Sequence, residues 1–363
     1  MCDILGWAAV FYVGETRSPT PALSLRRSKK QMKRLLFSGG GSRCILFAQA
    51  LVHLEKANLL TDVREYWGTS AGAFLAMMLA IGLSPAKIHP MILKTQFQKF
   101  RDMDVRNLFS FQTTWGLDDG ASLIAELERV VSLLAPKDIL LKDIPGLHIV
   151  LTDVTARETL VMSGLTHPHI RAVDAVRASM SLPLFYRPYR DPHSGHWWND
   201  GALRANFAWD LLPSDEEREQ TLGLCFLQPD KEIASFLQYM FSMVHFDEQR
   251  KQATWLREWS HRILCFPPPP FPAWYSKIDG EDIAMLEETA AALTSEWLTA
   301  HTVAAGTGET RRLCDPPNTR PSSSHPAPEA ESLGIPKSSA SPLPECPSPQ
   351  SSRPRPSYRR WSV

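Results

Sequence analysis

Long hydrophobic runs are missing from this sequence of 363 residues. The longest apolar stretch, residues 71–83, has 13 residues, whereas a helix needs about 20 apolar residues to cross a bilayer. A protein with several membrane-spanning helices is therefore excluded. An excess of charge of one sign is also absent, since 39 Lys and Arg residues balance 39 Asp and Glu residues. This balance argues against a protein coated in positive charge for nucleic acid, although it leaves room for a local basic patch.

Cysteine pairs are lacking as well. The six cysteines are scattered and form no C-x-x-C pair, so neither a zinc ribbon nor a small disulfide scaffold is indicated. The chain has no N-x-S/T sequon, and the cysteine pattern favours a reducing compartment. What the chain does have is 44% apolar and 21% charged residues. These ordinary globular proportions allow a sizeable core, and a length of 363 residues suits one large domain with appendages, or two domains.

We interpret residues 1–31 as an amino-terminal extension. An apolar stretch at residues 4–13 precedes a basic run, and only Asp3 precedes the apolar stretch. A secretory signal peptide would instead place positive charge first. The segment is either a weak membrane-surface anchor or a disordered leader, and the leader is favoured. Met32 could be the original start, since the first predicted strand follows it at once.

Residues 32–211 alternate between strand-like and helix-like segments. An apolar run at 33–38 ends in three glycines, and helical spacing follows over 43–60. Two more strand-like segments, 147–152 and 159–163, are joined by a turn. The β-α order predicts an α/β fold with a mostly parallel central sheet flanked by helices.

Two further segments follow this domain. Residues 212–304 are predicted to form a mainly helical extension that packs on it. Within the extension, residues 234–264 could cover the site, touch lipid or pack on the sheet, and packing is favoured. Residues 305–363 hold 12 of the 29 prolines, mixed with many serines, which predicts a disordered tail. Its Pro-rich stretches could bind proline-directed partners.

The strongest local signal is the G-x-S-x-G pattern Gly68-Thr69-Ser70-Ala71-Gly72, between a short strand and a predicted helix. In that setting the serine lies on a sharp turn with its hydroxyl exposed, and the flanking glycines let strand and helix approach closely. The positive end of the helix dipole favours negative charge that develops at the turn. An ordinary glycine-rich turn is the alternative, because the pattern arises by chance in roughly 10% of chains this long.

A second glycine-rich turn, Gly39-Gly40-Gly41-Ser42-Arg43, also follows a strand and precedes a helix. Its consecutive backbone N–H groups could converge on an anion. A phosphate-binding loop is one interpretation, but no Lys-Ser/Thr pair completes a Walker sequence, and Cys44 stands where G-x-G-x-x-G needs its last glycine. We favour an oxyanion hole for the serine about thirty residues later.

A serine nucleophile needs a base, and the histidines are poorly placed for that role. In α/β-hydrolases the order is Ser, then Asp or Glu, then His. His245 and His261 fall in a predicted helix, and His301 and His325 fall at or in the predicted tail. A conventional Ser-His-Asp triad is therefore disfavoured, with His245 and His261 as its remaining candidates.

An aspartate is the better candidate base. Asp-Gly pairs begin at Asp119, Asp200 and Asp279. Asp119 and Asp279 each precede a predicted helix and are typical of helix caps. Asp200 instead follows a strand-like aromatic run and precedes Gly201, which permits a tight turn. Asp200 is the predicted base.

These blocks, in this order, resemble the patatin-like phospholipase family. Besides the glycine loop, the G-T-S-A-G elbow and the late Asp-Gly pair, residues 177–185 resemble the family in an Ala-Ser run followed by Pro and Phe. The resemblance covers about residues 33–211. It implies a three-layer sandwich and a Ser-Asp dyad without histidine, with Ser70 as nucleophile and Asp200 as its proton acceptor.

The resemblance also implies supporting residues. Gly40, Gly41 and Arg43 would form the oxyanion hole, mostly through backbone N–H groups. The glycines that would support the motifs are Gly39, Gly68, Gly72 and Gly201. Two positions depart from the family pattern, since Cys44 replaces a glycine and Asn206-Phe207 stands where the family often has Asn-Pro. Neither departure removes a catalytic atom.

The implied activity is hydrolysis of glycerolipid esters, phospholipids or acylglycerols, through an acyl-enzyme, without a metal or other cofactor and independently of calcium. The partners would be lipids at a membrane or lipid-droplet surface, and not nucleic acid, with the protein cytoplasmic and peripheral to the membrane. A lipid transacylase with the same dyad and a catalytically silent lipid-binding protein are the alternatives. Seven residues could line an acyl channel, although most are expected in the core: Phe74, Met77, Met78, Leu184, Phe185, Trp197 and Trp198.

Overall fold

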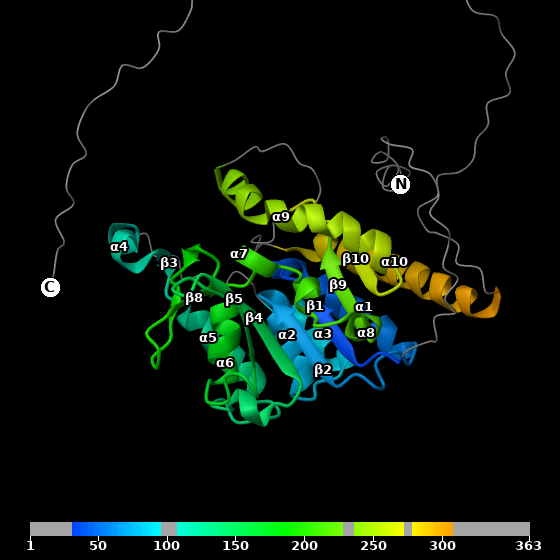
Figure 1. Cartoon of the computed structure of the whole chain (residues 1–363), viewed down its shortest axis with the longest axis horizontal. Helices are drawn as coiled ribbons and strands as arrows, with labels where there is room; N and C mark the ends of the chain where they lie inside the picture. Colours follow the sequence, from blue (N-terminus) through cyan, green and yellow to red (C-terminus); the bar gives the residue numbers. More distant parts are fainter. Residues whose placement is uncertain (1–30, 96–106, 228–235, 272–277, 308–363) are drawn as a thin grey trace, which may run out of the picture. The chain divides into compact units, whose positions relative to one another are not determined.

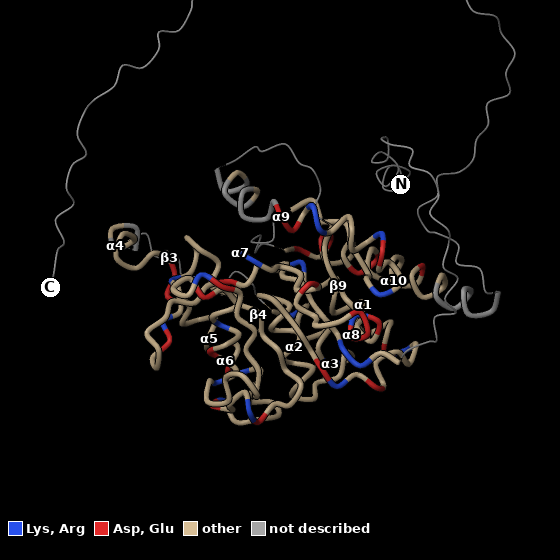
Figure 2. The backbone as a smooth tube through the Cα atoms, in the orientation of Figure 1, with Lys and Arg blue, Asp and Glu red and all other residues tan. Residues whose placement is uncertain are grey.

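The computed structural model describes residues 31–95, 107–227, 236–271 and 278–307. The expectations for the amino-terminal extension and for the proline-rich tail fall almost wholly outside these ranges. No helix within them is long and apolar enough to cross a membrane. Lys and Arg residues are interspersed with Asp and Glu residues along the described chain, as Figure 2 shows. Some of them form ion pairs, such as Arg34 with Glu65.

An eight-stranded sheet forms the centre of the fold (Figure 1), with strand order β10-β9-β1-β2-β4-β8-β7 and β5 paired to β4 off this path. The strands are β1 (Arg34–Phe37), β2 (Glu65–Thr69), β4 (Leu147–Asp153), β5 (Glu158–Ser163), β7 (Tyr189–Arg190), β8 (Trp197–Asp200), β9 (Thr221–Phe226) and β10 (Ile263–Phe266). The first five strands of that order are parallel, whereas β5 and β8 pair antiparallel with β4. The predicted mostly parallel sheet is confirmed.

Helices cover both faces of the sheet. The larger core cluster joins one face to α1 (Ile45–Lys56), α2 (Ala71–Ala80), α3 (Pro85–Lys94), α5 (Ala121–Val131), α6 (Ala172–Ser179) and α10 (Gly280–Thr307). The second cluster joins the other face to η5 (Ala208–Leu211) and α9 (Phe236–Trp259). Within β1, Leu35 and Phe37 belong to the larger cluster and Leu36 to the second, as the two-residue period of a strand requires. The architecture is therefore helix, sheet, helix.

Smaller elements complete the described chain. They are the 3-10 turns η2 (Gly41–Cys44) and η4 (Leu141–Asp143), the helices α4 (Asn107–Thr114), α7 (Ala202–Ala205) and α8 (Asp215–Glu219), and a separate two-stranded sheet of β3 (Gly116–Asp118) and β6 (Leu184–Tyr186). Asp119 and Asp279 lie at the starts of α5 and α10, as expected. Their carboxylates cap these helices by accepting hydrogen bonds from the N–H groups of Ala121 and Glu281.

The segment after residue 211 contributes strands as well as helices. It contains α9 and α10, and also β9 and β10, which the sequence analysis did not anticipate. β9 lies between β1 and β10, and each of its residues is buried. A short run buried on both faces shows no alternation of polarity, so its periodicity does not mark it as a strand.

Helix α9 packs on the sheet through its carboxyl-terminal half. Trp255 and Trp259 are buried in the second cluster with Trp209. This agrees with the favoured packing role for residues 234–264. Four other residues that prompted the alternatives lie nearer the start of the helix, where the structure does not describe their side chains: Phe236, Met240, Phe241 and Val244.

Candidate active site

Ser70 occupies the sharp turn between β2 and α2. Its φ of 54° and ψ of −123° are a strained conformation for a residue with a side chain. The turn depends on Gly68 and Gly72, because a Cβ at position 68 would lie 2.2 Å from the Gly72 carbonyl oxygen. Strand and helix can therefore approach only without side chains there, as the G-x-S-x-G pattern predicted.

Asp200 reaches Ser70 because β2 and β8 share one edge of β4. β5 pairs with β4 from His148 to Asp153 and occupies one edge. On the other edge Val150 pairs with Thr69 of β2, and the next residue, Leu151, pairs with Asp200 of β8. The two strands thus meet end to end, and Ser70 Oγ donates a hydrogen bond of 2.8 Å to Asp200 Oδ2.

The Asp200 carboxyl group is buried, with 2% of the residue exposed. Its second oxygen, Oδ1, accepts a hydrogen bond from the Ala202 N–H at 2.9 Å. Burial raises the pKa of Asp200 to about 7, and the hydrogen bonds from Ala202 and Ser70 oppose that rise. A carboxylate with this pKa is a much stronger base than one in water.

Ser179 fixes the backbone of the serine turn, a role that the sequence analysis did not assign. Its Oγ accepts a hydrogen bond from the Ser70 N–H at 2.8 Å and donates one to the Val150 carbonyl oxygen at 2.6 Å. The residue is fully buried at the end of α6. The Ala-Ser run at 178–179 was the available signal, but only the fold shows what this hydroxyl contacts.

The glycine loop lies directly against Ser70. A Cβ at Gly39 would lie 3.2 Å from Ser70 Cβ and 2.5 Å from Asn206 Oδ1. Gly40 and Gly41 open the 3-10 turn η2, where the first N–H groups lack partners within the turn. The Arg43 N–H, in contrast, donates to the Gly40 carbonyl oxygen at 3.2 Å. The Arg43 N–H is therefore already paired within the turn.

Arg43 instead ties the loop to a later segment. Its guanidinium donates from Nε at 3.1 Å and from Nη2 at 2.5 Å to the carbonyl oxygen of Phe271. Burial lowers the pKa of Arg43 to about 10. Cys44, the departure from the family pattern, is buried with a pKa raised to about 12 by that burial. Its thiol is therefore a packing group and not a nucleophile.

No described histidine contacts Ser70. His261 lies just beyond the end of α9, not within a helix, and its Nε2 is 3.2 Å from the Glu219 carboxylate. His196, which the sequence analysis did not consider, pairs through Nδ1 with Asp153 Oδ2 at 2.7 Å. The side chain of His245 lies outside the described residues. Across the described ranges, His, Cys, Asp and Glu side chains nowhere gather in threes as a metal site would require.

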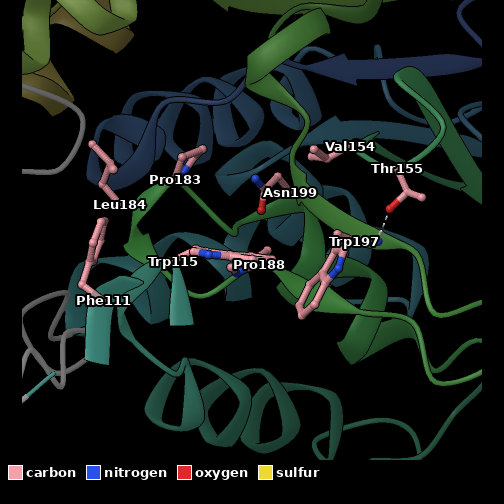
Figure 3. A pocket seen from close by; sticks show the side chains of 9 residues that line it. All are labelled: Phe111, Trp115, Val154, Thr155, Pro183, Leu184, Pro188, Trp197 and Asn199. Atoms are coloured by element: carbon pink, nitrogen blue, oxygen red, sulfur yellow. Dashed lines mark hydrogen bonds between the residues drawn. The ribbon is translucent and has the colours of Figure 1, made fainter. Parts of the chain in front are cut away.

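A pocket of about 470 Å³ opens beside β8 (Figure 3). It is lined by Phe111, Trp115, Val154, Thr155, Pro183, Leu184, Pro188, Trp197 and Asn199. Trp115 and Leu184 both have positive φ, 56° and 72°. Asn199 Oδ1 is buried without a hydrogen-bond partner among the described residues. The pocket is therefore mostly apolar, with Thr155 and Asn199 among its lining residues as uncharged polar side chains.

The pocket and the Ser70–Asp200 pair lie on opposite faces of β8. Asn199 pairs with Thr152 and Asp200 with Leu151, and consecutive strand residues point to opposite faces. Of the residues suggested for an acyl channel, Leu184 and Trp197 line this pocket. Most of the others are buried in the core, as expected: Phe74, Met77, Met78 and Trp198.

The sequence is similar to a known protein family and to a bacterial relative. The family model described as patatin-like phospholipase matches residues 35–213. The chain is 27% identical over 215 residues to the uncharacterized protein YqhO of Bacillus subtilis (strain 168). The aligned region covers 54% of this chain and 72% of YqhO.

Solved structures share features of this fold. The fold is similar to that of VipD from Legionella pneumophila, with a TM-score of 0.50, 15% identity and 75% of this chain and 67% of the other aligned. A looser match, with a TM-score of 0.42 and 16% identity, is ExoU in complex with SpcU from the type III secretion system of Pseudomonas aeruginosa, over 75% of this chain and 54% of the other. The likeness to VipD supports the fold.

Proposed function

The chain belongs to the patatin-like phospholipase family through residues 35–213, and from this premise we propose that it hydrolyses glycerolipid esters with a Ser70–Asp200 dyad. One observation carries the proposal. Ser70 Oγ, on a strained turn, donates a hydrogen bond of 2.8 Å to the buried carboxylate of Asp200. The arrangement pairs a nucleophile with a base within hydrogen-bond reach.

The first half of the reaction forms an acyl-enzyme. Asp200 takes the proton of Ser70 Oγ as this oxygen attacks the ester carbonyl carbon. The N–H groups of Gly40 and Gly41, beside the serine, stabilise the oxyanion of the tetrahedral intermediate. The ester C–O bond then breaks, and Asp200 passes the proton to the departing alcohol oxygen. A pKa of about 7 suits Asp200 to both transfers at neutral pH.

The second half releases the acid. A water molecule attacks the acyl carbonyl carbon while Asp200 accepts one of its protons. The bond between Ser70 Oγ and the acyl carbon breaks, and Asp200 returns the proton to Ser70. Asp200 is the donor or the acceptor in every proton transfer, so none of these steps calls for calcium. We therefore expect hydrolysis to continue when calcium is chelated.

We further propose that the protein works at a membrane or lipid-droplet surface, as a cytoplasmic and peripheral enzyme. Exposed apolar side chains support this surface role: Phe109, Trp115 and Val154 are 92%, 50% and 46% exposed. Val154 directly follows the carboxyl end of β4 and, like Trp115, lines the pocket beside β8. Such side chains can insert among lipids. The free thiols of Cys44, Cys225 and Cys265 fit a reducing compartment.

The deciding experiment measures lipid hydrolysis with calcium chelated. Intact protein and the Asp200→Asn and Ser70→Ala variants are given mixed phospholipids and triacylglycerol, and the products are identified by mass spectrometry. Asp279→Asn is the matched control, since it also changes an Asp-Gly pair but one that caps α10. We expect fatty acid release from the intact protein and the control, and a loss of at least 1000-fold in the two dyad variants.

Three results would change the proposal. Full activity in either dyad variant would refute the dyad. Acyl transfer to an added lipid alcohol in place of fatty acid release would identify a transacylase. An intact protein that neither releases nor transfers acyl groups, and whose Ser70 does not react with a fluorophosphonate probe, would be a silent lipid-binding protein.

A further inference from the structure

A buried glutamate from outside the family-matched segment reaches the backbone beside the dyad. Glu248 lies on α9 and is 9% exposed. Its two carboxylate oxygens accept hydrogen bonds from consecutive backbone N–H groups, Oε2 from Asn206 at 3.0 Å and Oε1 from Phe207 at 2.5 Å. The family model ends at residue 213. The helix therefore supplies a contact that the catalytic motifs do not contain.

The turn held by Glu248 contacts both catalytic loops. The carbonyl oxygen of Asn206 accepts the Gly39 N–H at 3.2 Å, and the Ala205 carbonyl oxygen accepts the Thr69 hydroxyl at 3.1 Å. Gly39 begins the glycine loop, and Thr69 immediately precedes Ser70. Residues 205–207 thus hydrogen-bond to residues beside both the oxyanion donors and the nucleophile.

The chemistry of this contact calls for a carboxylate. Two adjacent N–H donors need two acceptors, and an ionised carboxylate presents two oxygens and no donor. A glutamine would present one oxygen and one NH₂ group, so one of the two N–H groups would face another donor. Hydrogen bonds to a charged acceptor are also stronger than neutral ones. A merely space-filling role would be met as well by glutamine.

We propose that Glu248 is a positioning residue for the acyl-transfer site. By holding the turn at 205–207, it keeps the Gly39–Gly41 loop beside Ser70 in the conformation that presents the oxyanion donors. The proposal rests on the hydrolase function proposed above. It assigns α9 a part in catalysis at a distance, through backbone geometry and without contact to the substrate.

Kinetics of two variants and a control test the proposal. Glu248→Gln and Glu248→Ala are compared with Glu258→Gln, which lies on the same helix with 56% of its side chain exposed. With p-nitrophenyl butyrate we expect kcat to fall at least tenfold in Glu248→Gln and further in Glu248→Ala, with KM changed less than twofold. Glu258→Gln should match the intact protein. An unchanged kcat in both Glu248 variants would overturn the proposal.

The pH profile separates positioning from a general loss of stability. Burial raises the pKa of Glu248 to about 7, and the charge of Asp210 also raises it. The hydrogen bonds from Phe207 and Asn206 and the charge of Lys251 lower it. The Cys225 thiol also faces this carboxyl group. Below pH 7 Asp200 and Glu248 are then mostly protonated, and both must ionise for full activity. In that range log(kcat/KM) should therefore rise with increasing pH with a slope between 1 and 2. Glu248→Gln should reduce the slope to 1, and an unchanged slope would contradict the role.

Hydrogen exchange provides a readout that needs no activity. The Gly39 amide donates to Asn206, so its exchange reports whether the turn still holds the loop. We expect exchange in the peptide containing Gly39 to accelerate at least tenfold in Glu248→Gln and not in Glu258→Gln. If the intact protein proves inactive yet this acceleration appears, the hydrolase proposal fails and the bracing of the loop stands. Unchanged exchange would overturn the bracing whatever the activity.

Discussion

At the scale of single residues, burial of the Asp200 carboxyl group favours catalysis but makes the stability of the fold decrease as the pH rises toward neutrality. Folding raises its pKa from the ordinary 3.8 to about 7 through burial. The folded protein therefore keeps this proton between about pH 4 and pH 7, where the unfolded chain loses it. The resulting stabilisation is complete below the unfolded pKa and disappears as the pH rises through the folded pKa.

Asp200→Asn should remove this pH dependence, because an amide does not titrate. The free energy of unfolding of the variant, relative to the intact protein, should increase by up to about 4 kcal/mol between pH 4 and pH 8. Glu248 titrates in both proteins and cancels in the comparison. Urea unfolding at a series of pH values measures the difference. If the two proteins show parallel stability profiles, Asp200 has an ordinary pKa and the argument for its basicity falls.

Residue identities at the site were accessible from the sequence, whereas their supporting contacts were not. Ser70 and Asp200 each stand in a short motif with glycine beside it, so local patterns marked them. Ser179 and Glu248 act through hydrogen bonds to residues far along the chain, Ser70 and Phe207. A serine in a helix and a glutamate in a charged helix have no local signature of such partners. Only the packing of α6 and α9 on the sheet reveals them.

At the scale of elements, the site depends on one loop fitting into a small space. Gly39→Ala should disrupt it, because the new Cβ would lie 2.5 Å from Asn206 Oδ1 and 3.2 Å from Ser70 Cβ. The loop must then move away from the serine, and reaction of Ser70 with a fluorophosphonate probe should slow at least tenfold. Gly280→Ala is the control, since nothing lies within 4 Å of a Cβ there. Probe labelling of Gly39→Ala at the intact rate would show that the loop plays no part in the site.

The order of strands explains what the sequence could and could not predict about the fold. The apolar run before the glycine loop and the strand before the serine were predicted correctly as strands of a mostly parallel sheet, here β1 and β2. The meeting of β2 and β8 on one edge of β4 could not be predicted, because pairing partners depend on long-range topology. β9 was missed for a different reason, since its burial on both faces removes the alternation that marks a strand.

At the scale of the whole molecule, the residues after the family-matched segment are part of the catalytic fold. β9 pairs with β1, the strand that leads into the glycine loop, and α10 packs in the same core cluster as α1. Arg43 and the turn at 205–207 are likewise held by Phe271 and Glu248. A chain that ended near residue 213 would leave β1 as an unpaired edge and expose the apolar faces that α9 and α10 cover.

We therefore expect a chain truncated after residue 213 to aggregate or to unfold without a cooperative transition, and to lose Ser70 labelling. A chain truncated after residue 307 keeps all the described elements and should unfold like the full chain. Circular dichroism during thermal unfolding, together with fluorophosphonate labelling, compares the three. A soluble 213-residue chain that unfolds cooperatively and reacts at Ser70 would show that the motif-bearing segment folds alone. In that case β9, α9, β10 and α10 would be an accessory layer, and the contacts from Phe271 and Glu248 would be dispensable for placing the glycine loop.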